Sequence, residues 1–95
     1  MKYYLITSKP SASIEAGREL KFFEWLKHQE KTGKVREYWA LRNRPGIAAI
    51  LKMNFESELE EFLAAWNERA PAEFAIEPLM SKKALDAELA KKLFG

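Results

Sequence analysis

Two side chains in this sequence are candidates for proton transfer. Glu19 lies in a predicted helix, between Phe23 and Leu26 on a helical wheel, and a carboxyl group held among apolar side chains suits general acid or base catalysis. His28 is the only histidine, and imidazole commonly carries protons near neutral pH. For each residue the simpler alternative is a solvated position on the helix surface. We therefore take Glu19 and His28 as the candidate catalytic residues.

A basic group in the middle of the chain is a candidate site for an anion. It consists of Lys34, Arg36, Arg42 and Arg44. A guanidinium group binds a carboxylate through two parallel hydrogen bonds, so Arg36 is the best candidate for anchoring an acidic small molecule. Simple alternation along a strand places Arg36 on the same face as Tyr38 and places Trp39 on the opposite face. Solvated surface charge is the simpler alternative.

Aromatic residues form the third group of candidates. They are Tyr3, Tyr4, Phe22, Phe23, Trp25, Tyr38 and Trp39. Together they could line a cavity for a flat organic ligand, although large aromatic side chains also dominate protein cores and subunit interfaces. We expect four of them to contact a small organic ligand alongside Arg36, namely Tyr3, Phe22, Tyr38 and Trp39.

The composition argues against several other kinds of site. The chain has no cysteine, which removes disulfides, thiolate nucleophiles and thiolate metal ligands. A single histidine is too few for the usual zinc sites, which need several nitrogen or sulfur ligands. No glycine-rich phosphate loop, nucleophile elbow or dinucleotide fingerprint is present. We predict no metal and no cofactor.

The overall charge and hydropathy limit the partners. A formal net charge of +2 is too small to create a polyanion-binding surface, so we do not expect the protein to bind nucleic acid. If it did bind nucleic acid, Tyr38 and Arg36 on the bare face of the sheet would make the contacts. No segment approaches the ~20 apolar residues of a membrane span, and the apolar run at the N-terminus is too short for a signal peptide. We expect a cytoplasmic protein without a membrane segment.

The elements that must position these residues follow from the changes in hydrophobic period. Strands are predicted over 2–8, 35–41, 47–53 and 74–80. Helices are predicted from Ser11 or Ser13 to about 31, from the capping box Ser57–Glu60 to Pro71, and over 81–94. Pro45-Gly46 suits a tight hairpin turn. The order of residues 1–80 is β-α-β-β-α-β, which is the ferredoxin-like plan of an α+β fold.

The same pattern predicts self-association. A four-stranded sheet with helices on one face leaves its other face bare, yet these strands carry apolar side chains toward both faces. We expect a single domain over 1–95 that covers the bare face with a second copy, as a homodimer or a higher homo-oligomer. The amphipathic helix at 81–95 is expected to pack on the partner subunit, because a small domain gains useful burial in this way.

The middle of the chain resembles the muconolactone isomerase family. Gly33, Arg36 and Trp39 match the family's Gly, Arg and Trp on the second strand, and a hairpin, a helix and a Pro before the final strand follow. The resemblance covers roughly 20–79, and the histidine of the family's hairpin is absent here. It implies a dimeric α+β barrel with isomerase activity on a lactone.

Two functional expectations follow from these residues. The first is a small-molecule enzyme of the isomerase-like kind, acting on an acidic or aromatic-derived organic substrate. The second is a non-catalytic module of the same fold, which binds a ligand or another protein. Polar groups that converge on a cavity favour the first, and a fully packed aromatic interior favours the second.

Overall fold

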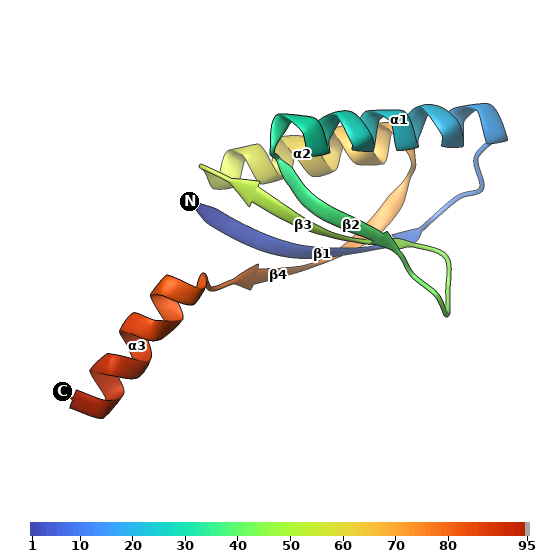
Figure 1. The fold of residues 1–95 in the computed structure, drawn as a ribbon. Helices are drawn as coiled ribbons and strands as arrows, with labels where there is room; N and C mark the ends of the chain where they lie inside the picture. Colours follow the sequence, from blue (N-terminus) through green and yellow to red (C-terminus); the bar gives the residue numbers. More distant parts are fainter. Residues whose placement is uncertain (95) are drawn as a thin grey trace.

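The computed structural model describes residues 1–94 as an α+β fold with one antiparallel sheet and three helices (Figure 1). In chain order the elements are β1 (Lys2–Pro10), α1 (Ala16–Thr32), β2 (Val35–Ala40), β3 (Ile47–Met53), α2 (Glu56–Arg69), β4 (Ala72–Leu79) and α3 (Lys82–Phe94). The predicted order of strands and helices is confirmed. The boundaries differ from the prediction by a few residues, most of all at the start of α1.

The sheet has the strand order β2-β3-β1-β4, and every neighbouring pair is antiparallel. This arrangement is compatible with the ferredoxin-like plan. β1 is central and pairs with both β3 and β4, while β2 and β4 form the edges. Pro78 lies in the edge strand β4, where a residue without an N–H group is tolerated.

The two faces of the sheet are distinguished by alternation along the strands. In β3 the side chains of Ile47, Ala49, Leu51 and Met53 are buried, whereas the residues between them are half-buried. The buried set faces α1 and α2, which lie together on one side of the sheet (Figure 1). The core therefore sits between this helix-covered face and the two helices.

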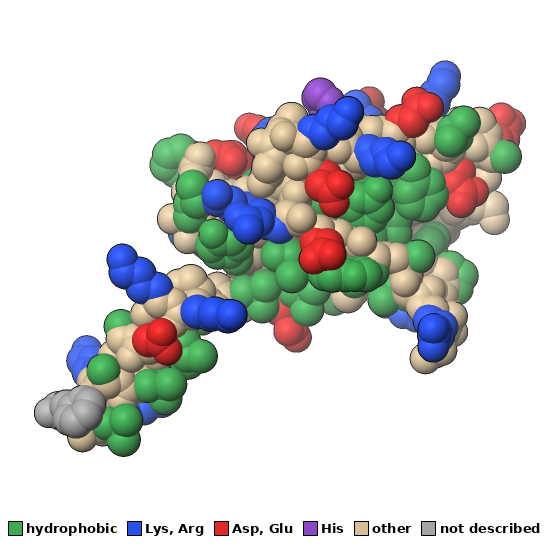
Figure 2. All heavy atoms as spheres, in the orientation of Figure 1, with side chains coloured by type: hydrophobic (Ala, Val, Ile, Leu, Met, Phe, Trp, Pro, Cys, Tyr) green, Lys and Arg blue, Asp and Glu red, His purple; other side chains and the backbone are tan. Residues whose placement is uncertain are grey.

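The opposite face of the sheet carries no helix and is largely apolar. Its residues follow from the strand register and include Tyr3, Leu5, Thr7, Trp39, Ala48, Ile50, Ala75 and Leu79, with Glu37, Lys52 and Glu77 among them. We call this set the open face. Figure 2 shows hydrophobic side chains exposed along the sheet on the side away from α1 and α2.

A β-bulge in β2 reverses the predicted faces of the residues that follow it. Val35 pairs with Leu51 and Glu37 pairs with Ile50, so Arg36 is an extra residue without a partner in β3. Directly paired residues in an antiparallel ladder share a face. Tyr38 therefore packs against the core beneath the helices, and Trp39 lies on the open face with 46% of its surface exposed. Simple alternation along the strand places Trp39 on the same face as Val35, and this prediction is wrong.

The helices begin and end differently from the prediction. Helix α1 starts at Ala16 and not at Ser11 or Ser13, and it ends at Thr32, close to the predicted end, with Gly33 as the C-cap residue at a φ of 88°. Helix α2 starts at Glu56, one residue ahead of Ser57, and no side chain caps its first turn. The predicted capping box is therefore wrong, because the chain enters the helix before the serine is reached.

Helix α3 projects away from the rest of the molecule (Figure 1). All side chains from Met80 to Leu93 are exposed, including Leu85 and Leu89, which lie one helical turn apart. The contacts that hold the sheet, α1 and α2 together do not involve α3. No helix within residues 1–94 combines the length and the apolar character needed to cross a membrane.

Candidate functional site

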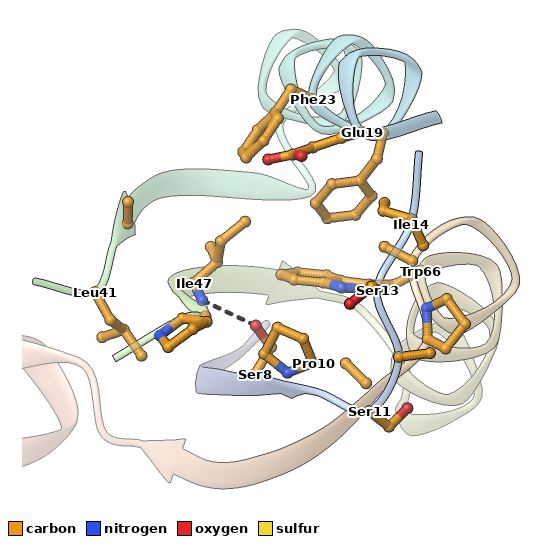
Figure 3. Close-up of a pocket in the computed structure, with 18 residues that line it drawn as sticks. Ser8, Pro10, Ser11, Ser13, Ile14, Glu19, Phe23, Leu41, Ile47 and Trp66 are labelled. Carbon is orange, nitrogen blue, oxygen red and sulfur yellow. Dashed lines mark hydrogen bonds between the residues drawn. The ribbon is translucent and has the colours of Figure 1, made fainter. Parts of the chain in front are cut away.

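A cleft of about 750 Å³ lies between α1 and one end of the sheet (Figure 3). Its floor is formed by the ends of β1 and β3, and its roof by α1. The segment 10–14 after β1, the hairpin loop 41–46 and the connection 70–72 between α2 and β4 form the walls. This volume is within the range of small-molecule sites in proteins.

The walls of the cleft are held in place by backbone hydrogen bonds. The N–H of Ser11 donates to the carbonyl oxygen of Pro71 over 3.0 Å, which ties the segment after β1 to the start of β4. Across the cleft, the N–H of Leu41 donates to the carbonyl oxygen of Gly46 over 3.0 Å and closes the hairpin loop. Each of these bonds holds one wall of the cleft through backbone atoms alone.

Ser8 lies at the floor of the cleft and is only 3% exposed. Its hydroxyl oxygen accepts a hydrogen bond from the backbone N–H of Ile47 over 2.9 Å (Figure 3). The carbonyl oxygen of Ser8 accepts a second bond, from Nη1 of Arg44, over 2.8 Å. At the end of the β1–β3 ladder, the side chains of Ser8 and Arg44 thus bond the backbone N–H of Ile47 and the carbonyl oxygen of Ser8. The buried hydroxyl group of Ser8 faces the cavity.

Gly46 makes this arrangement possible. Its φ is 139°, and a Cβ atom at this position would collide with the carbonyl oxygen of Ser8 and would lie 2.8 Å from Nη1 of Arg44. Nη1 of Arg44 also donates to the carbonyl oxygen of Pro45 over 2.9 Å. Glycine is therefore required where the hairpin approaches β1, because any larger residue would displace the Arg44 bond.

Aromatic side chains form the inner wall. Phe22 and Phe23 of α1 line the cleft and lie with ring centroids 5.4 Å apart. Trp66 of α2 also lines it and packs 5.2 Å from Phe22. Behind them the interior is filled by Trp25 and Phe62, whose rings are 5.2 Å apart. The aromatic residues therefore serve both as core and as the lining of a cavity.

Glu19 is the only ionisable residue among the described residues that line the cleft. Figure 3 shows its side chain pointing from α1 into the cavity, next to the ring of Phe23. The residue remains exposed to solvent. Its carboxylate therefore contributes negative charge at the rim and is not buried among apolar groups.

The structure brings only two of the predicted site residues together, Glu19 and Phe22. His28 is exposed on α1, nine positions after Glu19, and at about 100° per residue it lies on the opposite side of that helix. Arg36 is exposed at the bulge in β2 and does not line the cleft. The two candidate residues for proton transfer thus do not share a site.

The predicted aromatic contacts are also divided between two surfaces. Tyr3 and Trp39 belong to the open face, on the other side of the sheet from the cleft. Tyr38 packs half-buried against the core. The reason is structural, because the bulge at Arg36 places Tyr38, and not Trp39, on the same face as Val35.

Ser8 and Trp66 were not among the site residues predicted from the sequence. Tyr4, Ile6 and Ser8 are alternate residues of β1 that point to the helix-covered face, and Ser8 is the one polar member of this set. A serine that ends an apolar strand face is a signal that could have been used. Trp66 belongs to the apolar stripe of α2 with Leu59 and Phe62, so its sequence position does not distinguish it from a core residue.

No metal centre is apparent in the described part of the chain. Within residues 1–94, no three His, Asp or Glu side chains lie close enough together to hold a metal ion.

The comparisons with known proteins identify no family, since no family model and no curated protein matches the sequence. The resemblance to muconolactone isomerases therefore remains a prediction from a few residues.

Proposed function

We propose that this protein is a homodimeric α+β barrel that binds a small organic molecule in the cleft of each protomer. The observation that carries the proposal is the cleft itself: about 750 Å³, walled by Phe22, Phe23 and Trp66, with the hydroxyl of Ser8 at its floor. An apolar cavity with few polar groups is typical of small-molecule sites.

The open face supports the homodimer in this proposal. Half-buried apolar side chains such as Leu5 and Ile50 alternate with buried ones along β1 and β3, so both faces of the sheet are apolar. Sheets of this kind pack face to face at about 10 Å in other proteins, which removes both faces from water. A second copy placed there would leave the cleft free, because the cleft lies on the helix side.

Ligand binding can be tested with a cavity-filling variant and a matched control. Ala40 lines the cleft, whereas Ala64 is exposed on α2 and does not line it. A panel of aromatic compounds and lactones is titrated into isotope-labelled protein, and backbone amide shifts are recorded by NMR. We expect shifts at cleft residues in the wild type and in Ala64→Trp, and loss of these shifts in Ala40→Trp. Shifts scattered over the surface, or none, would contradict the proposal.

A second candidate function is isomerase-like proton transfer, favoured by the carboxylate of Glu19 in the cleft. In this reaction Glu19 takes a proton from the carbon next to a carbonyl group. The C–H electron pair forms a new C=C bond, negative charge develops on the carbonyl oxygen, and the proton returns to a different carbon. The hydroxyl of Ser8 is a donor that could stabilise the oxygen.

The test for catalysis uses hydrogen exchange. An unsaturated lactone is incubated with the protein in D₂O, and incorporation of deuterium next to the carbonyl group is followed by NMR. We expect incorporation with the wild type and none above background with Glu19→Gln. His28→Gln is the control, and it should exchange at the wild-type rate because His28 lies away from the cleft. Equal exchange by Glu19→Gln would exclude Glu19 as the base.

A further inference from the structure

We infer that the cleft selects an uncharged carbonyl compound that also carries an N–H or O–H group, and that it discriminates against carboxylates. This inference rests on the proposed ligand binding and adds the chemical class of the ligand. It departs from the acidic substrate that the sequence predicts. The groups that carry it are Ser8, Trp66 and Glu19, which all line the same cavity (Figure 3).

The first group is the hydroxyl of Ser8. Its oxygen accepts the N–H of Ile47, which leaves the hydroxyl proton as a donor. Ser8 Oγ donates to no acceptor among residues 1–94, although the residue is only 3% exposed. A buried hydroxyl proton facing a cavity is best satisfied by an acceptor oxygen from a ligand or from water.

The second group is the indole N–H of Trp66, which can only donate. It makes no hydrogen bond to another residue in the described part of the chain. Every fully buried side-chain nitrogen of residues 1–94 has a hydrogen-bond partner. Because Nε1 of Trp66 has none, this atom is not fully buried and must reach accessible space. Trp66 is 1% exposed overall and lines the cleft. Ser8 and Trp66 thus each contribute a hydrogen-bond donor among the residues that line the cleft, and a donor favours an acceptor such as a carbonyl oxygen.

The third group sets the charge of the cleft. Among residues 1–94, Glu19 is the only charged side chain that lines it, and nothing positive lines it in compensation. The nearby guanidinium of Arg44 directs Nη1 at the carbonyl oxygens of Ser8 and Pro45. A ligand carboxylate would therefore meet like charge from Glu19, whereas an N–H or O–H group could donate to it.

Three probes that share one apolar body test this inference. They are 2-naphthamide, 2-naphthoate and 2-methylnaphthalene, titrated separately and followed through the indole N–H signals of the labelled protein. We expect 2-naphthamide to bind about fivefold more tightly than 2-methylnaphthalene, the gain typical of one hydrogen bond. Binding of 2-naphthoate should be the weakest. The indole signal of Trp66 should move with the amide, while that of Trp39, on the open face, should stay.

Variants separate the polar contributions. Glu19→Gln removes a charge from an exposed position and should bring the affinity for 2-naphthoate to within about twofold of that for 2-naphthamide. Ser8→Ala should weaken the amide about fivefold and leave 2-methylnaphthalene unchanged. If Ser8→Ala does not fold, the Trp66 signal and Glu19→Gln still decide the question.

The outcomes distinguish this inference from the proposed function. Tighter or equal binding of 2-naphthoate, or equal binding of 2-methylnaphthalene and the amide, would overturn the ligand class and leave ligand binding intact. Failure of all three probes to bind would overturn the ligand class, and the proposed function falls with it when the panel of aromatic compounds and lactones also gives no shifts at cleft residues.

Discussion

The backbone N–H of Ile47 donates to the hydroxyl oxygen of Ser8 over 2.9 Å, in a position where two paired strands would normally exchange only backbone bonds. Ser8 precedes the last residues of β1, and Ile47 is the first residue of β3. The side chain thus ends the ladder and frees the carbonyl oxygen of Ser8 for Arg44. One serine connects the sheet, the hairpin loop and the floor of the cleft.

Replacing Ser8 should destabilise the protein. Ser8→Ala leaves the buried N–H of Ile47 without an acceptor, and we expect the free energy of unfolding to fall by about 1–3 kcal/mol. Urea denaturation followed by circular dichroism measures this change. Ser13→Ala is the control, because Ser13 lines the same cleft but is exposed, and its effect should stay within about 0.5 kcal/mol. Equal effects would argue against a structural role for the Ser8 bond.

Gly46 and Gly17 should respond to alanine in opposite directions. Gly46→Ala forces a Cβ atom against β1 in a backbone conformation that alanine rarely adopts, and we expect a loss of at least about 2 kcal/mol. Gly17 lies in α1, and a Cβ atom there would meet no other part of the protein within 4 Å, so Gly17→Ala should gain up to about 1 kcal/mol. Thermal unfolding of both variants provides the measurement, and a neutral Gly46→Ala would show that the hairpin can relax.

The open face should mediate dimer formation. Ile50→Glu places a charge among apolar residues of this face, and we expect it to shift the protein from dimer to monomer in sedimentation velocity. Leu20→Glu is the matched control, because Leu20 is 62% exposed on α1 and lies away from the sheet. A wild type that stays monomeric at high concentration would contradict the proposed homodimer.

Removal of α3 should leave the rest of the protomer intact. No side chain between Met80 and Leu93 is buried, so deletion of residues 81–95 from the Ile50→Glu variant should change its unfolding free energy by less than about 0.5 kcal/mol. In the wild-type background the same deletion should weaken self-association, because we expect α3 to pack on the partner. A large loss of stability in the monomeric variant would show instead that α3 packs on its own protomer.

The sequence predicted the elements that have a regular hydrophobic period. β3 is the clearest case, since its predicted bounds of 47–53 are those observed and every second side chain is buried. The ends of helices were less predictable. Ser57 looks like a cap in the sequence, but Glu56 already belongs to the helix, and the N-cap position is occupied by Phe55.

The site was harder to predict because it depends on pairing between distant segments. The bulge at Arg36 exists only relative to Leu51 and Ile50, and nothing in the local sequence marks it. It placed the half-buried side chain of Tyr38 against the core and that of Trp39 on the open face. The cleft likewise forms where α1, the hairpin loop and the segment after β1 meet, which no periodicity within one element reveals.

The central position of β1 has a consequence for how the chain folds. β1 is synthesised before β3 and β4, yet it pairs with both of them. Pairings between distant segments make folding slow. On the ribosome, one edge of β1 therefore stays unpaired until β4 emerges, so a nascent chain that stalls before Ala72 would expose a row of unpaired backbone N–H and C=O groups to other chains.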